Sequence, residues 1–206
     1  YFNKWSLRTD ATAFSTKNAS KNGQSSVQAS RRLRDDQVQV LKYCTDLVAL
    51  DLGHNEFSDI SFLENLTKLQ ILILVDNHIS DISMLENLKD LVYVELFLNR
   101  IEDVSALGTI EGLLDLNICY NNIKDPTPLY NCKKLERLWI SANRIDPDQW
   151  PEIAEALPNC KCIFKLWSST KGGWREHERY FWMHSFFYPE KYPELVAQSA
   201  SPVPEG

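Results

Sequence analysis

An asparagine recurs every 22 residues in the middle of this chain, and an apolar phrase of the same form precedes each one. At its first occurrence the phrase reads Leu47-Val-Ala-Leu-Asp-Leu-Gly-His-Asn55, with leucine at its first, fourth and sixth positions. The later copies end at Asn77, Asn99, Asn121 and Asn143. A fixed period in the twenties is typical of a solenoid, in which each coil contacts only its neighbours. This repeat therefore constrains the fold more than any other feature of the sequence.

Each copy of the phrase predicts a short strand followed by a turn. The leucines point inward from the strand, and the amide of the asparagine, which both donates and accepts hydrogen bonds, can satisfy backbone groups at the turn. Because the asparagines stack on successive coils, we expect their amides to form a ladder along the core. The next inward residues are Phe57, Ile79, Ile101, Ile123 and Ile145.

A column of carboxylates follows the asparagines, at Asp59, Asp81, Asp103 and Asp125. We expect each carboxylate to accept hydrogen bonds from free N–H groups at the start of a short convex helix. A calcium ladder is the alternative, but calcium takes about six to eight oxygen ligands and each coil offers one carboxylate. The sequence therefore predicts no metal site and no cofactor.

Residues 1–46 precede the repeats and are predicted to form an N-terminal strand, a mobile loop and a capping helix. Thr, Trp and Phe favour a strand within residues 4–14, and the Ser-, Asn- and Gly-rich residues 15–30 favour a loop. A helix is expected from about Asp36 to Cys44, in phase with the convex half of the first full coil. It would cover the N-terminal end of the core, as terminal repeats usually do.

Residues 47–166 hold the repeats, and the last coil is longer than the others. Asp146 and the prolines after it predict a helix over residues 146–157, and a final strand should lie within residues 157–166. Residues 167–206 are rich in aromatic side chains and end in a tail. We expect this segment to cap the open C-terminal end of the solenoid, with a membrane-binding belt or a ligand cage as alternatives.

Composition excludes several classes of function. The formal net charge of −6 argues against nucleic-acid binding, and no apolar run reaches the roughly 18 residues needed to span a bilayer. The five cysteines have no disulfide-framework spacing and are interpreted as free thiols. The segment His177-Glu-Arg-Tyr-Phe181 fails the zinc-protease pattern because its second histidine is missing. We therefore expect a monomer that is not an enzyme.

The strands of such a solenoid form a concave sheet, and the residues between the leucines face outward from it. Across neighbouring coils these positions bring together apolar and aromatic side chains that the coil itself does not need, with charged residues at their rim. The predicted partner-binding residues are Ile73, Tyr93, Glu95, Phe97, Leu98, Asp115, Asn117, Tyr120, Arg137 and Trp139. The alternative is that the N-terminal loop, or a longer native chain, folds over this face.

The phrases Asn77-His-Ile-Ser-Asp-Ile82 and Asn99-Arg-Ile-Glu-Asp-Val104 resemble the leucine-rich repeat subtype with a 22-residue period. This subtype includes bacterial internalins and a nuclear regulatory subunit of protein phosphatase 1. The segment Gly173–Met183 also resembles the end segment of uncharacterised repeat proteins from Gram-positive gut bacteria. The predicted fold class is therefore α/β: a right-handed leucine-rich repeat solenoid with a parallel concave sheet, short convex helices and caps at both ends.

The resemblance implies non-covalent protein recognition on the concave face. Our first hypothesis is a secreted or cell-surface bacterial recognition module, in which Tyr93, Phe97, Tyr120 and Trp139 contact a partner protein. The second is a cytoplasmic regulatory scaffold that holds an enzyme on the same face. A third is a carbohydrate-binding protein, because Tyr120 and Trp139 could stack on sugar rings beside Asp115 and Asn117.

Overall fold

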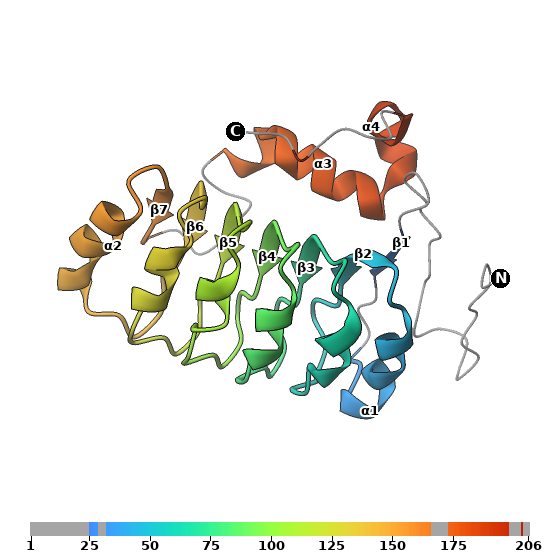
Figure 1. Ribbon diagram of the computed structural model, residues 1–206, viewed down its shortest axis with the longest axis horizontal. Coiled ribbons are helices and arrows are strands. Elements are labelled where there is room, and N and C mark those ends of the chain that lie inside the picture. The colour runs from blue at the N-terminus through green and yellow to red at the C-terminus, as the bar shows by residue number, and fades with distance from the viewer. Residues whose placement is uncertain (1–24, 29–31, 166–172, 198–202, 204–206) are drawn as a thin grey trace.

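A computed structural model describes residues 25–28, 32–165, 173–197 and 203 of the 206-residue chain. Its strands form one parallel sheet in chain order, so each coil adds one strand beside the last (Figure 1). The register follows the period, because Ala49 pairs with Ile71, Ile71 with Tyr93, and Tyr93 with Asp115. The strands are β1 (Ser25–Gln28), β2 (Leu47–Asp51), β3 (Ile71–Ile73), β4 (Tyr93–Glu95), β5 (Asp115–Asn117), β6 (Arg137–Trp139) and β7 (Lys161–Ile163).

Short helices line the convex side, and most of them are single turns of 3₁₀ helix. They are α1 (Asp35–Val38), η1 (Gln39–Tyr43), η2 (Ser61–Asn65), η3 (Ser83–Asn87), η4 (Leu107–Thr109), η5 (Thr127–Asn131), η6 (Pro147–Gln149) and α2 (Trp150–Ala156). The C-terminal segment adds η7 (Trp174–Glu176), α3 (Glu178–Phe187), η8 (Pro189–Lys191) and α4 (Pro193–Ala197). The predicted solenoid, with its parallel sheet and convex helices, is confirmed.

The main core lies between the sheet and the convex helices. The residues at the first, fourth and sixth positions of each phrase are buried there, as are the predicted inward residues from Phe57 to Ile123, with Ile145 8% exposed. The helix predicted near residues 36–44 is present as α1 and η1, and the long last coil contains α2 and β7 as predicted. Trp150 stacks on Phe164 at 5.2 Å between ring centroids, and Ile153 and Leu157 are buried. The C-terminal coil thus supplies its own cover for the core.

One N-terminal prediction is wrong. Residues 25–28 were expected within a loop but form β1, which pairs in parallel with β2. The exposed edge of β2 offers backbone N–H and C=O groups to any extended segment, so a polar sequence can pair there without β-branched residues. The strand predicted within residues 4–14 lies outside the described residues.

The asparagine ladder is present. The Asn99 amide donates to the carbonyl of Leu96 in its own coil at 3.1 Å and to Leu74 in the preceding coil at 2.9 Å. Its oxygen accepts from the Ile79 N–H at 3.1 Å. Asn121 and Asn143 repeat this pattern. Each amide therefore joins two coils and satisfies backbone groups that the turn leaves without ladder partners.

The aspartate column begins the convex helices, as predicted. Asp81 accepts a hydrogen bond from the Ser83 N–H at 2.9 Å, and Asp125 accepts one from Thr127 at the same distance. Ser83 and Thr127 are the first residues of η3 and η5. The hydrogen bonds from Ser83 lower the pKa of Asp81, which is the effect expected for a charged acceptor at a helix start.

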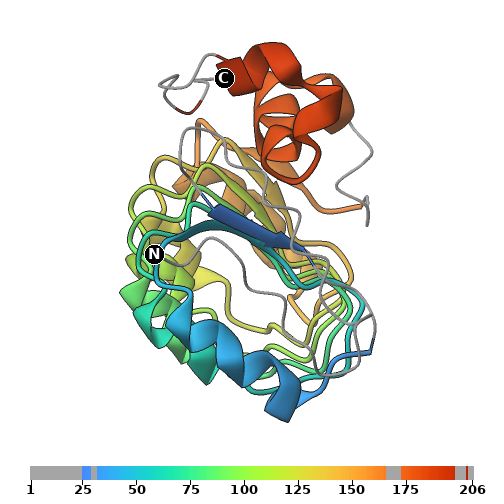
Figure 2. The same cartoon turned by 90° about the vertical axis from the view of Figure 1, so that its right-hand side faces the viewer.

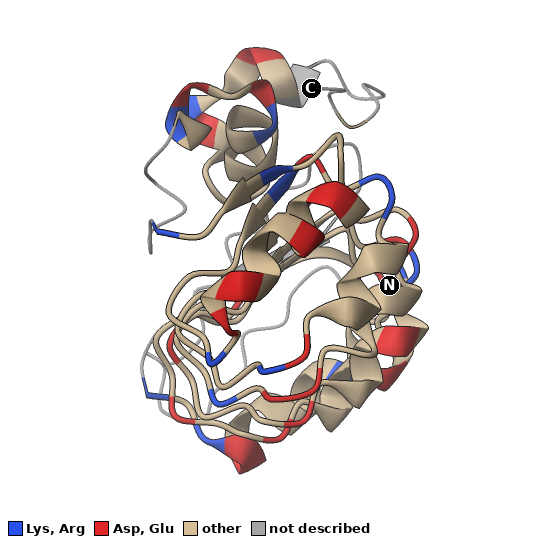
Figure 3. Cartoon of the chain, turned by 90° about the vertical axis from the view of Figure 1, so that its left-hand side faces the viewer, with Lys and Arg blue, Asp and Glu red and all other residues tan. Residues whose placement is uncertain are grey.

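Acidic and basic residues are both spread over the structure (Figure 3), as expected for a chain that contains both in number. Seen from the α2 end, acidic residues lie on several helices, and basic residues are interspersed with acidic ones along the loops (Figure 3). Among the described residues, no helix has the length and apolar character required to cross a bilayer.

Candidate functional site

The C-terminal segment lies across the concave face of the sheet (Figures 1 and 2). Trp174, Trp182 and Phe186 are buried against Ile71 and Tyr93 of the sheet, forming a second apolar cluster on the side opposite the main core. This differs from the predicted capping of the C-terminal end. The physical reason is that α2 and β7 already close that end, whereas the concave face presents Ile71, Tyr93 and Trp139, which need apolar partners.

Trp174 is the centre of this second cluster. Its ring stacks on Tyr93 with 5.5 Å between centroids and an interplanar angle of 3°, and it meets Trp139 edge-on at 5.7 Å. The guanidinium of Arg137 lies 5.3 Å from the centroid of the same ring, within cation–π range. Tyr93 and Trp139, two of the predicted partner-binding residues, therefore pack against Trp174 of the same chain.

A buried charge cluster fixes α3 to the sheet. Arg179 of α3 is 1% exposed, and its Nε donates to the Asp115 carboxylate at 2.6 Å. A second guanidinium nitrogen donates to Glu136. Arg137 also approaches Asp115, at 3.4 Å. Burial raises the pKa of Asp115, while Arg179 and Arg137 act in the opposite direction. Removing any one member would leave a buried charge with fewer partners.

The ten predicted site residues lie on one face but differ in accessibility. Tyr93, Asp115, Asn117 and Trp139 are buried. The predicted sugar site combined Tyr120 and Trp139 with Asp115 and Asn117, and of these four residues Tyr120 alone is exposed. Ile73, Glu95, Phe97 and Arg137 are half-buried, whereas Leu98 and Tyr120 are exposed. The C-terminal segment covers part of this face. The predicted alternative named a longer chain or the N-terminal loop, and most of that loop lies outside the described residues.

Leu98 and Tyr120 remain accessible in the turns that follow β4 and β5. They are 41% and 40% exposed, and the Tyr120 ring contacts Phe97 edge-on with 5.5 Å between centroids. Leu98 and Tyr120 precede the ladder asparagines and have φ angles of 58° and 54°. A left-handed backbone disfavours residues other than glycine, asparagine and aspartate. We call Phe97, Leu98 and Tyr120 the apolar patch.

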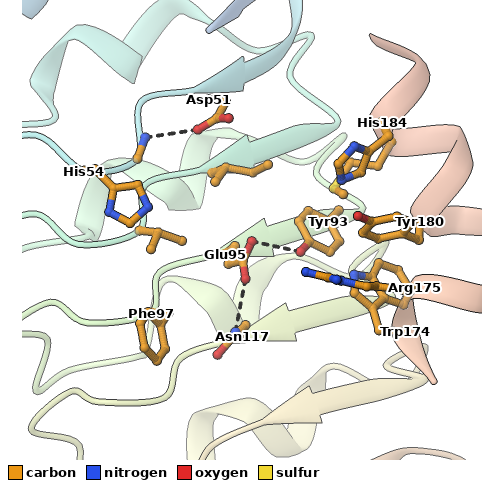
Figure 4. Close-up of a pocket in the computed structure, with 14 residues that line it drawn as sticks. Asp51, His54, Tyr93, Glu95, Phe97, Asn117, Trp174, Arg175, Tyr180 and His184 are labelled. Carbon is orange, nitrogen blue, oxygen red and sulfur yellow. Dashed lines mark hydrogen bonds between the residues drawn. The ribbon is translucent and has the colours of Figure 1, made fainter. Parts of the chain in front are cut away.

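A cavity of about 480 Å³ lies between the sheet and the C-terminal segment (Figure 4). Its floor consists of residues from β2 to β5 and the turns after them. Phe97 of the apolar patch belongs to this floor. Its wall comes from η7 and α3 and comprises Trp174, Arg175, Tyr180, Met183 and His184. Sequence reasoning missed these wall residues, although the density of aromatic residues after position 167 was the available signal.

Two carboxylates line the cavity floor. Glu95 accepts a hydrogen bond from the Tyr93 hydroxyl at 3.0 Å and another from the Asn117 amide at 3.2 Å. Asp51 accepts from the Gly53 N–H at 3.0 Å. Burial and the Glu95 charge raise the pKa of Tyr93 well above its usual value. The Tyr93 hydroxyl therefore stays protonated and serves as a donor to Glu95.

His184 contributes an uncharged imidazole to the cavity wall. Burial, together with Lys191 and Arg175, lowers the pKa of His184 to about 4, so its imidazole is uncharged near neutral pH. The described part of the chain contains no group of three or more His, Cys, Asp or Glu side chains arranged to hold a metal ion. The residues that line the cavity offer hydrogen bonding, charge pairing and contact with aromatic rings.

Comparisons with known proteins agree with this geometry. Residues 67–109 match the family model described as leucine-rich repeats in two copies. No curated protein matches the chain. Among solved structures, an internalin from Listeria monocytogenes is 28% identical with a TM-score of 0.53, and the match covers 67% of this chain and 46% of that one. Internalin C2 from the same organism is 27% identical with a TM-score of 0.51, covering 67% and 69%.

A plant peptide hormone receptor, solved in complex with RGF2, is also similar, with 28% identity and a TM-score of 0.52. That match covers 61% of this chain and 21% of the receptor. The chain thus spans less than half the length of the first internalin and about a fifth of the receptor. The fold is that of a leucine-rich repeat solenoid, a module that implies protein binding.

Proposed function

We propose that this chain is a non-catalytic recognition module that binds a partner protein on the part of the concave face left open by α3. The observation that carries the proposal is the apolar patch, in which Leu98 and Tyr120 stay about two-fifths exposed next to a covered face. Exposed apolar clusters on a folded protein tend to mark interfaces, and tyrosine is enriched among residues that dominate binding energy.

The backbone supports the same proposal. Asp76 and Ala142 occupy the position of Leu98 and Tyr120 in other coils, with φ of 53° and 55°. The turn therefore accepts a polar or small residue, and aspartate suits a left-handed backbone better than leucine does. The turn therefore does not require a large apolar side chain at Leu98, which is 41% exposed. We infer that Leu98 and Tyr120 serve a contact outside the chain.

We further propose a location at a bacterial cell surface, as a module of the 22-residue-repeat subtype. The similarity to two Listeria internalins supports this location. Protease shaving of intact cells tests it, because a surface module is released or cleaved while a cytoplasmic marker stays intact. Recovery of the full-length protein only after lysis would contradict the surface location and favour a cytoplasmic scaffold.

The binding proposal is tested with a Leu98→Asp, Tyr120→Asp double variant. The turn should tolerate both changes, since Asp76 has the same backbone conformation. The matched control is Tyr43→Asp, which removes an apolar side chain that is 71% exposed at the end of η1 on the convex side. Affinity capture should recover a partner with the wild type and the control but not with the double variant. If every recovered protein binds all three forms equally, the apolar patch is not the binding surface.

A further inference from the structure

A pair of cysteines lies at the C-terminal edge of the sheet. Cys160 and Cys162 flank Lys161, the first residue of β7, and β7 is the last strand in the order of the sheet (Figure 1). Cys162 pairs with Leu138 of β6, so it occupies a position that holds a leucine or valine in every earlier phrase. Leu138 is fully buried, whereas Cys162 is half-buried. The last coil therefore places a thiol, instead of a leucine, at the accessible edge of the core.

The two thiols are in contact with each other. The side chains of Cys160 and Cys162 form a hydrogen bond between their sulfur atoms. Both side chains are half-buried against the main core, and neither forms a disulfide. Core packing alone would be served by any small apolar residue at these positions and does not require two sulfur atoms side by side. The pair thus presents two soft ligand atoms together where solvent reaches them.

Two adjacent thiols suit a soft cation that takes two ligands. Thiolate sulfur favours Cu(I), zinc and iron–sulfur clusters. Zinc takes four protein ligands in structural sites and three in catalytic sites, but the described part of the chain has no group of three or more His, Cys, Asp or Glu side chains placed to hold a metal ion. All five cysteines and four histidines of the sequence lie within the described residues, so no further thiol or imidazole can join the pair from elsewhere in the chain. Cu(I) accepts two thiolates in a nearly linear arrangement, and it is therefore the cation that this pair fits.

The surroundings do not turn the pair into a larger site. Cys119 and Cys132 are 0% and 1% exposed within the core, and Cys44 follows η1 in the first coil, at the opposite end of the solenoid. The charged groups that act on Cys160 are Asp115 and Arg137, which have opposite signs. The ligand set of the site is thus the two sulfur atoms alone.

We propose that Cys160 and Cys162 bind one Cu(I) ion, each through its sulfur atom as a thiolate. Binding replaces the hydrogen bond between the thiols with two copper–sulfur bonds and releases both thiol protons to solvent. The proposal is independent of the proposed function, because β7 lies two and three strands from β5 and β4, whose turns carry the apolar patch.

The test is the transfer of Cu(I) from its coloured bicinchoninate complex to the full, reduced chain in the absence of oxygen. The wild type should take up one Cu(I) ion per chain. Cys160→Ser and Cys162→Ser should each weaken uptake about a hundredfold or more, since loss of even an outer-shell partner of a ligand typically costs about 10–100-fold in metal affinity. Cys44→Ser is the matched control, because Cys44 is also half-buried against the main core, and it should bind copper as the wild type does.

Two measurements on the wild type do not depend on how the variants fold. X-ray absorption at the copper edge of the loaded chain should show two sulfur neighbours and no other ligand. Zn²⁺ offered to the same chain, with a coloured zinc indicator as competitor, should bind much more weakly than Cu(I) because the pair provides only two of the ligands that zinc takes.

Equal uptake of Cu(I) by the wild type and by either serine variant at the pair would mean adventitious binding and would overturn the proposal. So would no uptake by the wild type, loss of uptake in Cys44→Ser, a third ligand at copper, or zinc binding as tight as copper binding. None of these outcomes bears on the proposed function, which is decided by partner capture with the Leu98→Asp, Tyr120→Asp double variant.

Discussion

Substitution of Arg179 by methionine should release α3 from the concave face. Methionine has a similar length and no charge, so it removes the contacts to Asp115 and Glu136 while leaving an apolar stem in place. Breaking a buried ion pair by removing one partner typically costs about 3–5 kcal/mol. Two features place the expected loss at the lower end. Arg137 still lies 3.4 Å from Asp115, and the Glu136 side chain is 28% exposed and can regain water.

A loss of about 3 kcal/mol corresponds to a fall in melting temperature of roughly 6–12 °C for a chain of this size. Urea denaturation followed by far-UV circular dichroism and by tryptophan fluorescence provides the measurement. Trp174 and Trp182 are buried by the docking of the C-terminal segment, so fluorescence reports the release of α3. If α3 detaches before the solenoid unfolds, the fluorescence transition will move to lower urea while the dichroism transition stays in place.

The control is the double variant Asp115→Leu, Arg179→Met. Replacing a buried ion pair by apolar residues is often neutral or stabilising, and Ile71 and Tyr93 occupy the same strand position in the two preceding coils. The double variant should therefore recover most of the stability lost by Arg179→Met. A loss below about 1 kcal/mol in Arg179→Met, or additive losses in the two single variants, would refute the proposed role of this ion pair.

Two other perturbations test the structure at separate places. The pKa of His184 is about 4 in the folded protein and near 6.5 in the unfolded chain. Between these two pH values the unfolded chain binds more protons, so the free energy of unfolding should fall as the pH decreases from 6.5 to 4. Melting curves of His184→Gln should show a smaller loss over this range, and identical pH profiles would contradict the assignment. A Cβ at Gly108 would lie 2.3 Å from the Pro128 carbonyl oxygen of the next coil, so Gly108→Ala should destabilise by about 1–3 kcal/mol. A Cβ added at Gly112 would lie 3.7 Å from its nearest neighbours, so Gly112→Ala should be neutral or stabilise by about 0.4–1 kcal/mol. Equal urea midpoints for Gly108→Ala and Gly112→Ala would contradict this reasoning.

The solenoid was predictable because every coil has the same turns and helix starts, which need the same residue types at the same positions. Asn99 and Asn121 must satisfy backbone groups at equivalent turns, and Asp81 and Asp125 must begin equivalent helices. Five copies of one phrase make such roles visible in a single sequence. The strand at 25–28 has no such copy, since backbone pairing at the edge of β2 needs no particular side chains.

The covering of the concave face was not predictable from the same evidence. An aromatic segment after the repeats could cover either the open end of the core or the sheet face, and composition does not distinguish them. The deciding facts are contacts between distant residues, such as Arg179 with Asp115, 64 positions apart. Asp115 was assigned to a polar rim because its neighbours in sequence gave no sign of a buried cation.

The position of α3 changes what the concave aromatics mean. A single aromatic set on a solenoid face suggests one binding surface, but here Tyr93 and Trp139 are buried by Trp174 of the same chain. Their presence is explained by folding and gives no independent support to a partner site. Leu98 and Tyr120 differ because they remain exposed and occupy left-handed backbone positions, where Asp76 shows that a polar residue fits. The turn does not require a large apolar residue at these two positions, so a partner's contribution should be sought there first.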